Sequence, residues 1–212
     1  MRSSASLISD KDRWPRLALI VLAVGVASRA WGYLSAGSLW LDELFLASSF
    51  RHLSYQELLG PLRDSQTAPV AWLWIEKTVW NGLGSHELAL RLPSLVASIL
   101  TLPLTFLVAR RLLRARWAVL PLFLVAVSPY AVWQAFQVKP YSFDLLVAVT
   151  LAWFAIAVLD RQIWAWPSIA VVGTVAVFVS MPSIFVLVAI VVVLVAATIL
   201  DRSQTRPRWI VI

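Results

Sequence analysis

The chain of 212 residues is 60% hydrophobic, with a mean hydropathy of +0.81, and only 14% of its residues are charged. A soluble domain carries about 25% charged residues, so the composition excludes an ordinary soluble protein and indicates a membrane protein. The net charge of +7 does not indicate a nucleic-acid partner, because the basic residues cluster in short segments between apolar runs. The absence of cysteine excludes disulfides and thiolate metal sites.

The apolar runs predict an all-α fold, a polytopic transmembrane helical bundle. A crossing helix needs about 20 apolar residues, and such spans are expected at about residues 14–35, 88–108, 117–136, 142–159, 164–180 and 183–200. The last two are separated because the charge-free stretch 162–200, at about 1.5 Å per residue, is too long for one crossing. A further span begins near residue 209, so residues 1–212 are interpreted as the N-terminal transmembrane portion of a longer protein.

The basic residues also predict the orientation of these spans. Arg110, Arg111, Arg114 and Arg116 form the strongest cytoplasmic marker in the chain. The sequence therefore predicts a multi-pass protein of the cell membrane with a cytoplasmic N-terminus. Within the first span, Arg29 is expected to snorkel to the outer interface. The alternative is that it faces a wet cavity.

Residues 38–87 are expected to form the first extracytoplasmic loop, which is too charged to cross the membrane. Residues 41–53 are predicted to form one short helix. Residues 69–83 form another, because Trp72, Ile75, Val79 and Leu83 recur at helical spacing. Trp-rich amphipathic helices of this kind lie in the plane of the membrane interface.

Two adjacent acids, Asp42 and Glu43, stand out in the apolar and aromatic run 39–50. Carboxylates are costly near hydrocarbon and usually mark a functional site. The alternative is an interfacial loop with two solvated acids. A helix N-terminus would favour their ionised forms, whereas apolar surroundings would raise their pKa values.

Three other elements are expected at the same face of the membrane: Gln66-Thr67-Ala68-Pro69, Arg91 at the start of the second span, and the segment FQVKPYSFD. The last supplies Lys139, Tyr141 and Asp144. The alternative for Arg91 and Lys139 is snorkelling to the headgroups, and for Tyr141 an interfacial aromatic anchor.

Together these motifs resemble the polytopic glycosyltransferases that use polyprenyl-phosphate sugar donors, the family of protein mannosyltransferases and aminoarabinose transferases (glycosyltransferase family 39, GT-C fold). The W-x-D-E element at the first outer loop, the segment Ser85–Ser94 and the segment Ser128–Tyr141 carry the resemblance, in the family's order. Two departures are Thr67-Ala68-Pro69, where many relatives have His or Lys before proline, and Lys139, where many have Arg.

The resemblance implies transfer of a sugar from a polyprenyl-phosphate-linked donor to an extracytoplasmic acceptor (a glycan, lipid or protein), with membrane lipid as a further partner. Asp42 is then the candidate base, and Glu43 orients Asp42, binds the acceptor or is structural. Arg91, Lys139 and Tyr141 are the candidates for binding the donor phosphate. Asp42 and Asp144 are candidate ligands for a divalent cation such as Mg or Mn, although no third ligand is evident.

Two other classes remain open from the sequence. A transporter or lipid flippase would line a translocation path with its intramembrane charges. A non-catalytic relative would bind lipid without turnover.

Overall fold

The computed structural model describes residues 4–203, and throughout this range the chain forms helices joined by turns and loops. The prediction of an all-α polytopic bundle is confirmed. The elements are α1 (Ser4–Ser35), α2 (Leu41–His52), η1 (Glu57–Leu59), η2 (Arg63–Ser65), α3 (Val70–Leu83), α4 (Glu87–Leu112), α5 (Ala115–Val127), α6 (Pro129–Gln134), α7 (Tyr141–Leu159), α8 (Ala165–Val179) and α9 (Ser183–Ser203).

Within the described residues, four segments are long and apolar enough to cross a membrane: Trp14–Ser35, Glu87–Leu112, Tyr141–Leu159 and Ser183–Leu200. The apolar helices α5 and α8 are shorter, with 13 and 15 residues. At about 1.5 Å per residue each is some 20 Å long, against a hydrocarbon core of about 30 Å. Six crossings and a cytoplasmic N-terminus therefore stay predictions, and the expected span near residue 209 lies outside the described residues.

The predicted span over residues 117–136 is divided into α5 and α6. The division falls at Ser128, whose backbone is extended and whose hydroxyl accepts a hydrogen bond from the Ala131 N–H at 3.3 Å. Pro129 follows at the first helical position, where its missing N–H costs nothing. A serine cap followed by proline restarts the helix and moves α6 out of line with α5.

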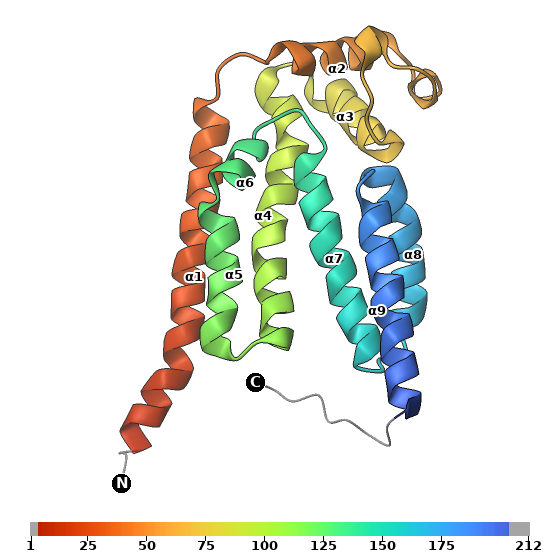
Figure 1. Cartoon of the computed structure of the whole chain (residues 1–212). Coiled ribbons are helices and arrows are strands. Elements are labelled where there is room, and N and C mark those ends of the chain that lie inside the picture. The colour runs from red at the N-terminus through yellow and green to blue at the C-terminus, as the bar shows by residue number, and fades with distance from the viewer. Residues whose placement is uncertain (1–3, 204–212) are drawn as a thin grey trace.

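The helices pack side by side, with α4 and α7 in contact at the centre and a cap of two helices at one end (Figure 1). Helices α1, α4 and α5 contact one another, α4 contacts α7, and α7 contacts α8 and α9. Helices α2 and α3 lie across the end at which α4 and α7 begin, called here the loop end. There α3 contacts α2, α4 and α8.

Arg29 is buried inside the bundle, so the expected snorkelling is wrong. Its guanidinium donates hydrogen bonds to the Ser98 hydroxyl at 2.7 Å and to the carbonyls of Val125 and Ala126 at 3.0 and 3.1 Å. These carbonyls belong to the last turn of α5, where no following helical N–H can satisfy them. Gly25 permits this contact, because a Cβ there would lie 2.9 Å from the Cβ of Ala126.

The segment between α1 and α4 is a packed layer. Leu46 and Phe50 from α2 and Trp72 and Leu73 from α3 share one buried cluster with Val138, which follows α6. The rings of Phe50 and Trp72 meet edge to face, with centroids 6.0 Å apart. This cluster joins α2, and the acids at its start, to the segment before α7.

Helix α3 buries an acid as well as Trp72. Glu76 has no exposed surface, and both its carboxyl oxygens lack a hydrogen-bond partner. Desolvation raises the pKa of Glu76 well above its usual value. Ile75 and Val79, expected on the apolar face of this helix, line an apolar groove with residues of α4 and α7.

Candidate active site

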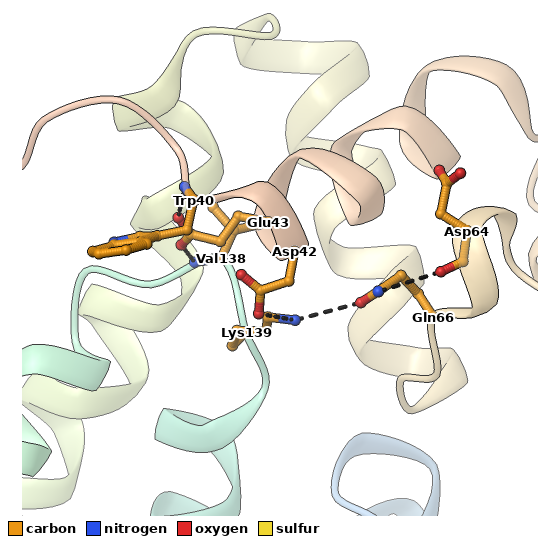
Figure 2. Close-up of polar contacts among 7 residues, drawn as sticks. All are labelled: Trp40, Asp42, Glu43, Asp64, Gln66, Val138 and Lys139. Atoms are coloured by element: carbon orange, nitrogen blue, oxygen red, sulfur yellow. Dashed lines mark hydrogen bonds and ion pairs between the residues drawn. The ribbon is translucent and has the colours of Figure 1, made fainter.

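An ion pair joins α2 to the segment that begins α7. The carboxylate of Asp42 lies 2.9 Å from the ammonium of Lys139 (Figure 2), and the two residues are 97 positions apart in the chain. The side chain of Asp42 is 59% exposed, whereas that of Lys139 is 14% exposed. Two of the residues singled out in the sequence therefore meet at the loop end, with the acid facing the solvent side.

Glu43 connects the backbone segments that carry the two members of this ion pair. It is fully buried, and its two oxygens accept hydrogen bonds from the backbone N–H of Trp40 at 2.8 Å and of Val138 at 2.6 Å (Figure 2). The first bond caps α2 in the manner of a capping box, in which the third helical residue reaches back to the cap. The second fixes the residue before Lys139, so one carboxylate sets both partners of the ion pair.

The backbone around Lys139 is held from two further sides. The hydroxyl of Ser94 donates to the Lys139 carbonyl at 3.0 Å, and the hydroxyl of Ser142 donates to the Gln134 carbonyl at 3.0 Å. The ammonium of Lys139 also donates to the side-chain oxygen of Gln66 at 3.5 Å. The QTAP element of the sequence thus reaches the ion pair through Gln66.

The pKa of Asp42 lies below its usual value, because Lys139 donates a hydrogen bond to the carboxylate and adds a positive charge beside it. These effects outweigh the partial loss of hydration, which acts in the opposite direction. The raised pKa that apolar surroundings would give Asp42 is therefore wrong, because Lys139 decides the direction of the shift. Asp42 is accordingly ionised at neutral pH and can accept a proton.

Arg91 lies near the pair but contacts different groups. It is 2% exposed, and its guanidinium donates to the carbonyls of Ala36 and Ser38, each at 3.4 Å, while its Nε has no partner. These carbonyls belong to the connection between α1 and α2. Arg91 therefore holds the segment that leads into Asp42, and its binding of a donor phosphate stays a prediction.

Asp144 lies one helical turn into α7, close to Ser180 in the turn between α8 and α9. Its Oδ1 is buried and has no hydrogen-bond partner. Within residues 4–203 no three His, Cys, Asp or Glu side chains gather as metal ligands. Asp42 is bound by Lys139 and Asp144 faces another turn, so a divalent cation held by these two acids stays a prediction.

A hollow of about 450 Å³ opens beside the ion pair. We call it the aromatic hollow, since Trp40, Tyr130, Trp133 and Tyr141 line it together with Asp42 and Lys139. Gln134 and Gln137 complete its wall. Of these residues, the sequence predicted site roles for Asp42, Lys139 and Tyr141. The others lie within the motifs that carry the family resemblance, but no role was predicted for them, because exposed aromatic residues near a membrane surface are common.

The fold and this site define a polytopic membrane protein with a carboxylate–ammonium pair and an aromatic hollow at one end of the bundle. A family model described as dolichyl-phosphate-mannose-protein mannosyltransferase matches residues 67–212. The match covers most of the chain, which therefore belongs to this family of membrane glycosyltransferases. Arg91, Lys139 and Tyr141 fall inside the matched residues, whereas Asp42 and Glu43 precede them. Comparison with curated proteins and with solved structures gave no match.

Proposed function

We propose that this protein transfers a sugar from a polyprenyl-phosphate donor to a hydroxyl or amine acceptor at the extracytoplasmic face of the cell membrane. Family membership supports a lipid-linked donor in general terms. The observation that carries the proposal is the contact of 2.9 Å between Asp42 and Lys139. Such a transfer needs a base for the acceptor and a positive charge for the departing phosphate, and this pair supplies both.

Lys139 is the residue proposed to bind the phosphate. It immediately precedes the first turn of α7, a helix of 19 residues. A helix N-terminus favours anions, because its free N–H groups and its dipole both face them. When the bond between the anomeric carbon and the phosphate oxygen breaks, the electron pair stays on that oxygen, where the ammonium stabilises it.

Asp42 is the proposed base. As the acceptor atom bonds to the anomeric carbon, its proton passes to the carboxylate. Attack from the face opposite the phosphate inverts the anomeric carbon, as the family resemblance implies. A phosphate that binds Lys139 also draws the ammonium away from Asp42 and so removes the main cause of its lowered pKa. Donor binding would in this way make Asp42 a stronger base.

Glu43 and Arg91 are proposed as positioning residues. Glu43 is fully buried and its oxygens are occupied by two backbone N–H groups, which favours the structural alternative over acceptor binding. Arg91 fixes the connection that leads into α2. Tyr141 is 46% exposed at the rim of the aromatic hollow, and its O–H can donate a hydrogen bond to a phosphate held by Lys139.

Transfer activity of the full-length protein in membranes, with polyprenyl-phosphate mannose as donor, tests the proposal. Asp42→Asn should lower turnover by about 100-fold or more, the usual contribution of a general base. Asp64→Asn is the matched control, because Asp64 is an exposed acid of the same loop whose side chain does not contact Lys139. Lys139→Gln should raise the KM for the donor, and in Lys139→Arg the KM should lie between that of Lys139→Gln and that of the wild type.

Full transfer by Asp42→Asn would reject the assignment of the base. Lipid movement across the membrane without any sugar transfer by the wild-type protein would favour the transporter or flippase class instead.

A further inference from the structure

Four aromatic rings face the aromatic hollow with much of their surface uncovered. Trp40 is 63% exposed, Tyr130 65%, Trp133 44% and Tyr141 46%. Helix α6 supplies two of them, Tyr130 and Trp133, which lie three residues and therefore about one turn apart on the same face. The aromatic part of the wall thus offers flat rings, against which the apolar face of a ligand can pack.

Gln134 adds a buried acceptor to this wall. The residue is 5% exposed, and its side-chain oxygen has no hydrogen-bond partner. A buried polar atom without a partner costs about 1–3 kcal/mol, so an unpaired acceptor at a hollow points to a ligand that donates a hydrogen bond. Gln134 is held in place by its backbone, since its carbonyl accepts from Ser142.

The position of Lys139 indicates which kind of ligand the hollow can hold. The ammonium of Lys139 lines the same hollow. A sugar is joined to its phosphate through a single oxygen. If the phosphate lies on Lys139, the adjoining hollow, which the aromatic residues and Gln134 line, can hold the ring. A volume of about 450 Å³ falls within the range of small-molecule sites, about 300–1,000 Å³.

We propose that the aromatic hollow is the subsite for the donor's sugar ring, with Trp133 as the stacking surface and Gln134 as the acceptor for a sugar hydroxyl. This inference rests on the proposed function, because it takes the phosphate to lie on Lys139. It adds Trp133 and Gln134 of helix α6, to which the sequence assigned no role, to the determinants of sugar specificity.

Two ligands that differ only in the sugar separate this inference from the proposed function. The full-length protein in lipid nanodiscs is loaded with radiolabelled polyprenyl-phosphate mannose, and its displacement by unlabelled polyprenyl-phosphate mannose or by sugar-free polyprenyl phosphate gives a Kd for each. Trp133→Ala and Gln134→Leu should weaken binding of the mannose-bearing lipid by about 3- to 10-fold. Binding of polyprenyl phosphate should not change, and Trp133→Phe should recover part of the lost affinity.

Trp31→Ala is the matched control for an interfacial aromatic residue, because Trp31 is 75% exposed on α1 and does not line the hollow. It should change neither Kd, whereas Lys139→Gln should weaken both ligands. Equal weakening of both ligands by Trp133→Ala, or no effect on either, would overturn the subsite. If Trp133→Ala changed only the KM for the acceptor, the subsite would also be overturned, because the hollow would then hold the acceptor. Failure of the wild-type protein to bind either lipid would overturn the proposed function and the subsite together.

Discussion

Replacing Glu43 by glutamine tests the link between the two halves of the site. The carboxylate offers an acceptor to each of two backbone N–H groups, at Trp40 and Val138, with no access to water. Glutamine keeps one acceptor oxygen and presents an NH₂ group to the other N–H. One charge-assisted bond is lost and a buried donor is left unpaired, which together cost about 2–4 kcal/mol.

Hydrogen–deuterium exchange of the protein in nanodiscs measures this cost locally. Since every 1.4 kcal/mol is a factor of ten, exchange in residues 36–44 and 134–142 should become about 30- to 700-fold faster in Glu43→Gln. Glu57→Gln is the matched control. Glu57 also accepts a backbone N–H three residues back, from Ser54 at 2.7 Å, but it is exposed and its bond closes only a local turn. In Glu57→Gln, faster exchange should be confined to residues near Ser54.

Unchanged exchange around Val138 in Glu43→Gln would refute the bridging role of this carboxylate. So would an equal change around Val138 in Glu57→Gln, because the effect would then follow from loop charge and not from the buried contact.

Three further variants test the bundle by thermal unfolding in detergent. Arg29→Met should destabilise the folded protein by about 2–4 kcal/mol, because it leaves the Val125 and Ala126 carbonyls and the Ser98 hydroxyl unpaired. Arg114→Met, at an exposed position, is the control and should not change stability. An Arg29→Met variant as stable as the wild type would contradict the buried hydrogen-bond network. Glu76→Gln should stabilise the protein at neutral pH by about 1–3 kcal/mol. The raised pKa of Glu76 means that the folded state holds its proton more tightly than the unfolded state, so wild-type stability falls as pH rises above the unfolded value of 4.5. The advantage of the variant should therefore vanish below that pH, and a difference independent of pH would speak against a buried acid. Gly25→Ala should lower the free energy of unfolding by about 1–3 kcal/mol, because the added Cβ overpacks against Ala126. Gly82→Ala in α3, whose Cβ meets open space, should leave stability unchanged or raise it by up to about 1 kcal/mol. Equal effects of the two variants would show that helix propensity alone is measured.

Asp42 shows which properties the sequence predicts and which it does not. The position of Asp42 and Glu43 in the first turn of a short helix followed from local pattern, and α2 begins at Leu41 as expected. The direction of the pKa shift did not follow. It depends on Lys139, which is 97 residues away in the chain and is brought to 2.9 Å by the fold.

Arg29 gives the same lesson inside the bundle. Its depth along α1 could be counted from the sequence, but its partners could not. Whether a long cationic side chain snorkels or turns inward depends on unpaired carbonyls at the end of α5, and that end is set by the Ser128–Pro129 break.

By itself the sequence determined that this is an all-α membrane protein, where most of its helices begin and end, and which acids and bases stand at the helix ends. These properties follow from apolar run length, charge and capping residues, all of which act within a few turns of the chain. Only the tertiary structure decided that Glu43 is buried while Asp42 is exposed, that Arg91 binds carbonyls, and that α6 lines a hollow beside Lys139. Burial and pairing depend on which distant segments meet, and no local pattern encodes that.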